Sequence, residues 1–288
     1  MKKVLVTGAS GQLGMELRLL AEGRKDFIFT DLVPCGDIRP LDILDERAVR
    51  LMVQEENVGA ILNCAGYTDV NRAESEPALC RAINADGAGI LARAARQAGA
   101  ALIHISTEYV FDGRNPAGYD ETARRHPLSA YGRSKRDGED KVRRSGCRGL
   151  IVRTSWLFSP FGRNFVKTML RLGAEKSEIG VVRDQVGSPT YARDLAEVLL
   201  ALYGRVGERR GEIYNYTNAG TCSWADFAAA IFKEAGLSCK VRPIATTEYP
   251  SPAVRPACSI LSKEKISRDF GITPRPWEEA LSACLQRL

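Results

Sequence analysis

The chain opens with Val4-Leu5-Val6-Thr7-Gly8-Ala9-Ser10-Gly11-Gln12-Leu13-Gly14, a short apolar run followed by glycines at every third position. The apolar run is typical of a buried strand, and the residues after it have the periodicity of an amphipathic helix. Glycines at such a turn leave room for a phosphate to approach the first N–H groups of the helix. We therefore expect the turn to bind a dinucleotide pyrophosphate through Gly8, Gly11, Gln12, Leu13 and Gly14.

Apolar runs and amphipathic segments alternate over the first half of the chain. The apolar runs predict strands at 4–6, 27–30, 60–63, 101–105 and 150–153. Helical periodicity between them predicts helices at 12–22, 45–56, 78–97 and 129–144. This order predicts an α/β fold of the Rossmann type, with a doubly wound parallel sheet.

Beyond about residue 155 the alternation is less regular. Helices are expected at 164–176, 192–203 and 223–235 and near 262–269 and 277–288, and strands at 179–182 and 212–215. We expect residues 1–155 to form the dinucleotide-binding domain. Residues 156–288 are expected to form mainly a smaller substrate-binding lobe, with some segments returning to the first domain.

Composition narrows the class of protein. The chain has 288 residues, is 44% hydrophobic and carries a formal charge of +6, with basic and acidic residues interspersed. That balance suits an anionic small substrate better than nucleic acid, because no basic stripe with interleaved aromatic residues is present. Eight scattered cysteines predict free thiols, and no apolar stretch is long enough for a signal peptide or a membrane span. We expect a cytoplasmic protein with no membrane partner.

Asp31 ends the second predicted strand, roughly twenty residues after the glycines. A carboxylate there can accept a hydrogen bond from the adenosine ribose and would repel a 2′-phosphate, which favours NADH. Arg24, Lys25 or Arg39 could still accommodate a 2′-phosphate, so the expected cofactor is NADPH or NADH. Further cofactor contacts are expected at Asp42, Ile43, Cys64, Ala65, Gly66, Tyr67 and Thr68.

Tyr131 and Lys135 are four residues apart in a predicted helix and therefore share one face. An unperturbed tyrosine has a pKa of about 10, so a nearby ammonium group is needed to bring proton transfer towards neutral pH. A surface pair supporting the helix is the simpler alternative. The glycine turn and Thr107, at the end of the fourth predicted strand, favour a catalytic Thr107–Tyr131–Lys135 set in which Lys135 also holds the nicotinamide ribose.

These motifs resemble the extended short-chain dehydrogenase/reductase superfamily. Within it, segments over nearly the whole chain resemble the dTDP-4-dehydrorhamnose reductases: 63–70 (NCAGYTDV), 106–113 (STEYVFDG), 153–156 (RTSW), 164–170 (NFVKTML), 184–190 (DQVGSPT) and 255–256 (RP).

The resemblance implies reduction of the 4-keto group of a dTDP-4-keto-6-deoxyhexose, with Tyr131 as proton donor and Thr107 hydrogen-bonded to the reacting oxygen. The sugar nucleotide would be bound by Thr107, Glu108, Trp156, Asn164, Gln185 and Arg255. Trp156 could instead be a core residue, and Arg255 a solvated loop residue.

The sequence departs from the family at two places. Glu108 stands where relatives usually carry Asp, which would shift sugar contacts. Some relatives dimerise around magnesium held by glutamates; Glu16 matches one ligand, but the others fall at Arg193 and Arg287. Arginines cannot ligate a cation, so we expect no metal there and a monomer or homodimer.

Three alternatives remain open from the sequence. One is reduction of a different nucleotide 4-keto sugar, and another is a non-catalytic dinucleotide-binding regulatory subunit. The third is a 4,6-dehydratase or epimerase. A dehydratase typically presents consecutive Asp-Glu after the threonine, whereas this chain has Glu108 followed by Tyr109.

Overall fold

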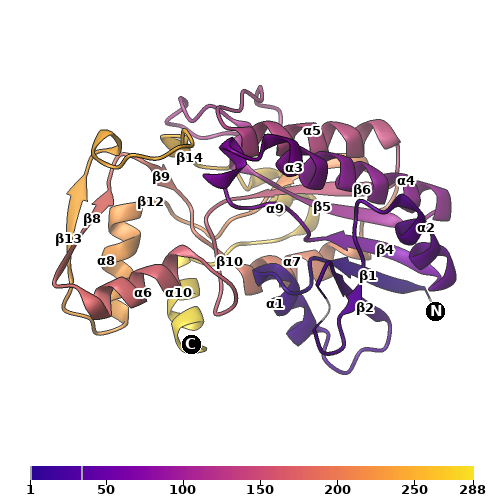
Figure 1. The fold of residues 1–288 in the computed structure, drawn as a ribbon, viewed down its shortest axis with the longest axis horizontal. Helices are drawn as coiled ribbons and strands as arrows, with labels where there is room; N and C mark the ends of the chain where they lie inside the picture. Colours follow the sequence, from indigo (N-terminus) through magenta and orange to yellow (C-terminus); the bar gives the residue numbers. More distant parts are fainter. Residues whose placement is uncertain (1, 34) are drawn as a thin grey trace.

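In the computed structural model, which describes residues 2–33 and 35–288, a parallel sheet of seven strands forms the centre of the larger part of the molecule (Figure 1). Its strand order is β3-β2-β1-β4-β5-β6-β11. The strands are β1 (Lys3–Thr7), β2 (Phe27–Asp31), β3 (Arg39–Pro40), β4 (Val58–Asn63), β5 (Ala101–Thr107), β6 (Gly149–Thr154) and β11 (Arg210–Asn215). Starting from β1, the chain adds β2 and β3 on one side and then β4, β5 and β6 on the other. This reversal in the order of strand addition confirms the predicted doubly wound sheet.

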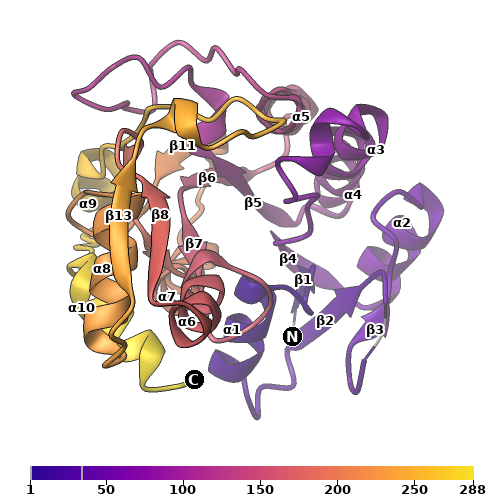
Figure 2. The same ribbon diagram turned by 60° about the vertical axis from the view of Figure 1, so that its left-hand side comes forward.

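Helices cover both faces of this sheet (Figures 1 and 2). One face packs against α1 (Gln12–Leu20), α7 (Ala192–Tyr203) and α9 (Glu264–Phe270). The other packs against α2 (Glu46–Glu55), α4 (Ala88–Ala98) and α5 (Ala130–Ser145). The strands are apolar on both sides because neither face is in contact with water.

The helix predicted at 78–97 is not continuous. It is divided into α3 (Pro77–Arg81), a π-helical turn, η2 (Ala82–Gly87), and α4. Asn84 lies in this π-helical turn. Its side chain accepts from the Tyr67 N–H at 2.9 Å and donates to the Tyr67 carbonyl oxygen at 3.0 Å. A Cβ at Gly138 would come within 2.3 Å of the Asn84 carbonyl oxygen, so α5 lies directly against this turn. π-bulges of this kind are frequent at functional sites.

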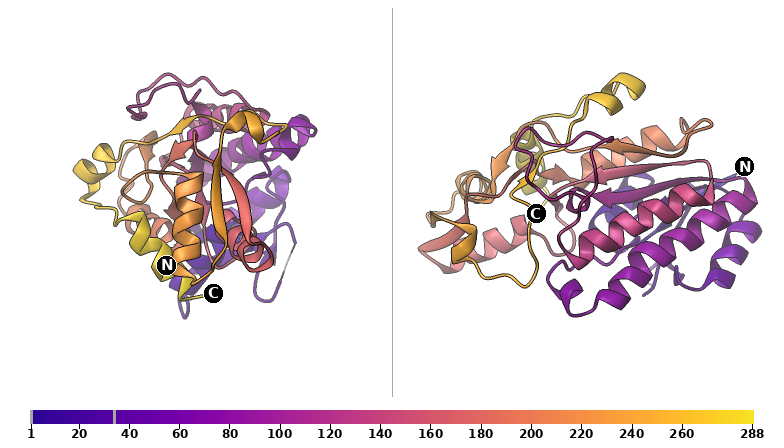
Figure 3. Two further views of the ribbon diagram at one scale, coloured as in Figure 1. Left: turned by 90° about the vertical axis from the view of Figure 1, so that its left-hand side faces the viewer. Right: turned by 90° about the horizontal axis from the view of Figure 1, so that it is seen from above.

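A second, smaller lobe is formed mainly by later segments of the chain (Figure 3). Its own core includes Phe158, Phe227 and Trp277. Its helices are α6 (Phe165–Glu175), α8 (Trp224–Glu234) and α10 (Trp277–Leu285). Its strands are β7 (Leu157–Phe158) with β10 (Thr190–Tyr191), β8 (Glu178–Val182) with β13 (Lys240–Ile244), and β9 (Val186–Gly187) with β12 (Cys222–Ser223) and β14 (Cys258–Ser259). Short 3₁₀ turns occur at η1 (Arg72–Glu74), η3 (Glu108–Val110) and η4 (Thr246–Glu248).

Three elements from beyond residue 155 pack with the large sheet: β11 as its edge strand, and α7 and α9 on one face. The end of the chain is also tied to the first helix. Glu16 on α1 is fully buried, and both its oxygens lie 3.0 Å from Nη1 of Arg287. Arg193 lies 3.8 Å away, so two guanidinium groups neutralise this carboxylate.

Within residues 2–33 and 35–288, no helix combines the length and apolarity that a membrane crossing requires. Cysteines are free throughout these ranges.

Candidate active site

A cleft of about 910 Å³ opens at the carboxyl ends of β1, β4 and β5. This is the edge at which open α/β sheets bind ligands. Most of the residues predicted for cofactor, catalysis and substrate line it together: Gly8, Gly11, Gln12, Leu13, Asp31, Asp42, Ile43, Cys64, Ala65, Gly66, Thr68, Thr107, Glu108, Tyr131, Lys135 and Trp156. The cleft therefore joins the glycine turn to the Tyr-Lys pair.

Five predicted residues do not line the cleft. Gly14 is packed beneath the turn, where a Cβ would come within 2.3 Å of the Gly8 carbonyl oxygen. The Tyr67 hydroxyl donates to Glu76 at 2.8 Å. Asn164 caps α6, and its Nδ2 donates to Gln12 Oε1 at 3.0 Å, which orients that cleft residue.

The other two of these five lie in the later segments. Gln185 donates to the Thr246 hydroxyl at 3.1 Å. Arg255 donates to the Tyr109 hydroxyl at 3.0 Å and to Asn71 at 3.2 Å. Because Tyr109 lines the cleft, the Arg255 guanidinium lies one side chain away from it.

The glycine turn has the geometry of a phosphate site. Gly8 has a φ of +69°, and a Cβ there would come within 2.5 Å of the backbone nitrogen of Ala65. Helix α1 begins after Gly11 with no side-chain cap. The N-terminal N–H groups and the positive end of the helix dipole are thus available to an anion that approaches the turn.

Asp31 is held beside this turn at the end of β2. Its two carboxylate oxygens accept from the backbone N–H groups of Ser10 at 2.9 Å and Leu32 at 2.8 Å. Arg24 lies at the opposite end of β2, paired with Asp26 at 2.8 Å, and Arg39 is paired with Glu56 at 2.6 Å. The two arginines considered for a 2′-phosphate are therefore engaged elsewhere.

Tyr131 lies in the first turn of α5, whose N-cap Ser129 accepts from the N–H of Gly132 at 3.0 Å. Its phenol lies beside Thr107, and the Thr107 hydroxyl donates to Glu108 at 2.7 Å. Burial raises the pKa of the Glu108 carboxyl to about 7. Burial, with the charge of Glu108, also raises the pKa of Tyr131 above its ordinary value.

Lys135 follows one helical turn later, as expected, but its ammonium contacts the main chain rather than the phenol. Nζ donates to the Ile105 carbonyl oxygen at 2.6 Å. Burial lowers the pKa of Lys135 to about 8, and the negative charge of Glu139 partly offsets this lowering. A Cβ at Gly66 would lie only 3.9 Å from Nζ, so the missing side chain leaves the ammonium accessible from the cleft.

Trp156 forms an aromatic wall of the cleft in a conformation unusual for its residue type. Its φ is +48°, in the left-handed region that costs a bulky residue of the order of 1–3 kcal/mol. The indole stacks on Trp224, with centroids 3.5 Å and planes 11° apart. A Cβ at Gly187 would come within 2.7 Å of the indole, so the glycine makes room for it.

Several cleft residues were not predicted, notably Ser10, Tyr109 and Arg163. Tyr109 could have been found, because it directly follows Thr107-Glu108; its ring packs edge-to-face on Tyr131, with centroids 5.4 Å apart. Arg163 lies on a loop of the second half of the chain. No local pattern in the sequence places that loop against the glycine turn.

Comparisons with known proteins agree with this geometry. The family model described as RmlD substrate binding domain matches residues 1–288. The spore coat polysaccharide biosynthesis protein SpsK of Bacillus subtilis is 41% identical, over 99% of this chain and 98% of that protein. The dTDP-4-dehydrorhamnose reductase of Aggregatibacter actinomycetemcomitans is 41% identical over 98% and 97% of the two chains.

A solved structure of the dTDP-4-dehydrorhamnose reductase from Bacillus anthracis, in complex with NADP, superposes with a TM-score of 0.90 at 41% identity over 100% of both chains. Family model, relatives and structure agree along the whole sequence. The chain belongs to the dTDP-4-dehydrorhamnose reductase family.

Proposed function

We propose that this protein reduces the 4-keto group of dTDP-4-dehydro-β-L-rhamnose to give dTDP-L-rhamnose, with NADPH or NADH as reductant, in the cytoplasm. The observation that carries the proposal is the convergence of the glycine turn with Thr107, Tyr131 and Lys135 in one cleft. A regulatory subunit would have no need of the catalytic set. Membership of the reductase family supports this reaction over elimination or epimerisation.

The residues around the turn fit a dinucleotide. Gly8 and Gly11 leave the start of α1 open to the pyrophosphate, and Asp31 lies where the adenosine ribose would be held. Lys135 would hold the hydroxyls of the nicotinamide ribose, because its ammonium is accessible beside Gly66. When bound, the nicotinamide supplies the hydride for C4.

Tyr131 is the proposed proton donor. Its hydroxyl gives the proton to the oxygen at C4 as that oxygen gains negative charge, and the phenolate is later reprotonated from solvent. Thr107 lies beside the phenol and lines the cleft, so its hydroxyl is proposed to bond the same substrate oxygen. The raised pKa of Tyr131 keeps the phenol protonated before the reaction.

The sugar nucleotide would extend from Tyr131 towards the second lobe. The flat indole of Trp156 offers the hexose an apolar wall, and Glu108 can accept from sugar hydroxyls. Arg255, next to Tyr109, would hold the diphosphate bidentately. Asn164 supports Gln12 rather than the sugar, and Gln185 is buried, bonds Thr246 and does not line the cleft.

The direct test is an assay of the purified protein with dTDP-4-dehydro-β-L-rhamnose, following oxidation of NADH and of NADPH. We expect oxidation coupled one-to-one to dTDP-L-rhamnose. The corresponding UDP- and GDP-linked 4-keto-6-deoxy sugars serve as comparison substrates. Failure to oxidise either cofactor with any of them would refute the reductase, and water loss from dTDP-glucose without net oxidation would identify a dehydratase instead.

We predict that NADH is used with about tenfold higher kcat/KM than NADPH, because the Asp31 carboxylate would repel the 2′-phosphate. Arg24 and Arg39, which could otherwise neutralise that phosphate, are paired with Asp26 and Glu56. Asp31→Ser should remove most of this preference, as measured by initial rates with each cofactor. Asp37→Ser is the matched control, since this carboxylate is exposed and does not line the cleft. An equal change in both variants would show a general charge effect instead.

We also predict that Glu108→Gln stabilises the protein in alkaline solution. The folded-state pKa of Glu108 is raised from 4.5 to about 7. The carboxyl therefore favours folding below pH 4.5, and this contribution is lost as the pH rises through about 7. At pH 8 the variant should gain up to about 3 kcal/mol in free energy of unfolding.

Urea denaturation of both proteins at pH 5 and pH 8 measures this gain. Exposed Glu248→Gln is the control substitution. A difference between Glu108→Gln and the parent that does not change with pH would contradict the raised pKa.

A further inference from the structure

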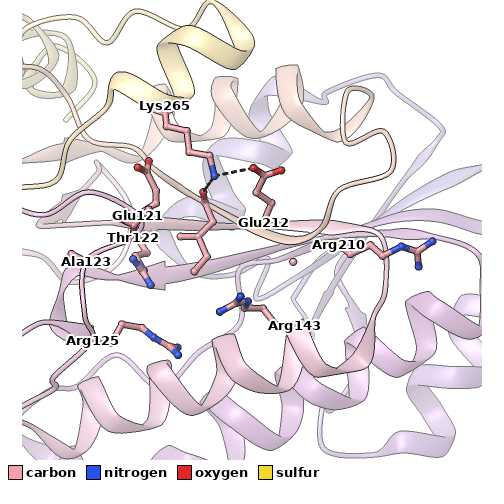
Figure 4. Close-up of a pocket in the computed structure, with 11 residues that line it drawn as sticks. Glu121, Thr122, Ala123, Arg125, Arg143, Arg210, Glu212 and Lys265 are labelled. Carbon is pink, nitrogen blue, oxygen red and sulfur yellow. Dashed lines mark hydrogen bonds and ion pairs between the residues drawn. The ribbon is translucent and has the colours of Figure 1, made fainter.

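A second cavity, of about 570 Å³, lies away from the active-site cleft and shares no lining residue with it (Figure 4). It lies between the loop at 121–125, the second half of α5, the edge strand β11 and α9. Its lining includes five basic side chains and two acidic ones. Most ligand pockets in proteins have volumes of 300–1,000 Å³, so this one has room for a small molecule.

Some of these charges are already paired. Lys265 donates to the Ile213 carbonyl oxygen and forms an ion pair with Glu212, both at 2.9 Å. Arg125 is paired with Asp140 at 2.7 Å and Glu139 at 3.1 Å. These groups hold the wall of the cavity together and leave little of their charge for a ligand.

Other basic groups at the cavity have unused donors. Among residues 2–33 and 35–288, the Arg143 side chain has neither a hydrogen bond nor an ion pair, although it points towards the cavity (Figure 4). Arg210 donates to the Gly146 carbonyl oxygen and lies 3.7 Å from exposed Glu208. Arg153 is 1% exposed, and its Nη1 is buried with no hydrogen-bond partner in the described part of the chain.

The backbone of the edge strand at Gly211 lets Arg143 lie at the cavity wall. The pairing of β11 with β6 shifts register between Arg210 and Glu212, at Gly211. Gly211 has a φ of +63°, and a Cβ there would come within 3.0 Å of Cγ of Arg143. A glycine in the left-handed region thus lets the edge strand approach α5 at Arg143, whose guanidinium points into the cavity, while Arg210 extends to the Gly146 carbonyl oxygen (Figure 4).

We propose that this cavity is a second binding site, for a small molecule that carries a phosphate or diphosphate group, with Arg143 and Arg210 holding the phosphoryl oxygens. Planar guanidinium groups with free donors match phosphate oxygens in pairs. Arg153 also lines the cavity, and its buried Nη1 has no acceptor among the described residues. Ile213 and Ala123 provide apolar wall for the rest of the ligand.

The test is isothermal titration of the full-length protein, saturated with NADPH to fill the dinucleotide site, with inorganic pyrophosphate as probe. We expect saturable binding that Arg143→Ala/Arg210→Ala weakens about tenfold or more, the scale of lost charge-assisted hydrogen bonds. Arg144→Ala is the matched control, because Arg144 is the exposed neighbour of Arg143 and does not line the cavity. It should bind as the parent does.

All titrations are made in an Arg255→Ala background, which removes the proposed diphosphate contact of the active site, so the remaining pyrophosphate binding is assigned to the second cavity. Pyrophosphate binding that survives the double substitution, or that Arg144→Ala weakens equally, would overturn the proposal. A second titration with ADP distinguishes the sources of the phosphoryl group. Tighter binding of ADP than of pyrophosphate supports a nucleotide ligand, and equal binding supports recognition of the phosphoryl group alone.

Discussion

Tyr131→Phe should reduce turnover by about 10²–10⁴-fold, the usual contribution of a positioned general acid. The substitution removes only the phenol hydroxyl and keeps the ring, which packs on Tyr109. NADPH binding should therefore be retained. Steady-state assays give the loss in kcat, and quenching of NADPH fluorescence gives the dissociation constant.

Tyr109→Phe is the matched control for this experiment. Tyr109 is also a half-buried tyrosine lining the cleft, but its hydroxyl accepts from Arg255. It should affect KM more than kcat, because Arg255 is proposed to hold the diphosphate. If Tyr109→Phe lost turnover and Tyr131→Phe kept it, the proton donor would be Tyr109.

Arg153→Ala should lower the free energy of unfolding by about 3 kcal/mol, the lower end of the usual cost of breaking a buried ion pair, because Arg125 at 3.1 Å remains as a second partner of Glu139. Arg153 holds both oxygens of fully buried Glu139 at 2.8 Å. Burial opposes the charge on Glu139, but the hydrogen bond and charge of Arg153 hold the pKa of that carboxyl below its ordinary value. Urea denaturation at neutral pH measures the loss.

The double variant Arg153→Met/Glu139→Gln should recover part of this stability, because no buried charge remains. Arg148→Ala provides the comparison with a surface pair: Arg148 lies 3.8 Å from exposed Glu208, and its loss should cost under about 1 kcal/mol. Equal losses for Arg148→Ala and Arg153→Ala would contradict the buried-pair argument.

The same pair connects the fold to the catalytic residues. Glu139 follows Lys135 by one turn of α5 and accepts from Ser106, the residue before Thr107, at 2.6 Å. Its charge opposes the lowering of the Lys135 pKa by burial. Nothing in the spacing of Tyr131 and Lys135 indicated this support, because Arg153 and Ser106 reach Glu139 from neighbouring strands of the sheet.

The large sheet could be predicted because its signals are local. Apolar runs of three to five residues, separated by helical periodicity, describe strands that lie between two layers of helices. The π-helical turn at Ala82–Gly87 was missed, since one extra residue in a turn hardly changes the apolar pattern of α3 and α4. The pairings of β7, β9, β12 and β14 were missed as well, because two-residue strands carry no periodicity.

The sequence by itself determined the glycine turn, the strand order expected of a doubly wound sheet, and the helical face shared by Tyr131 and Lys135. These depend on conformations set within a few residues. Only the tertiary structure decided that Lys135 contacts Ile105, that Trp156 takes a left-handed backbone to stack on Trp224, and that arginines from separate segments surround a cavity. Burial and charge pairing between residues distant in sequence decide these features, and no local pattern records which partners the fold will bring together.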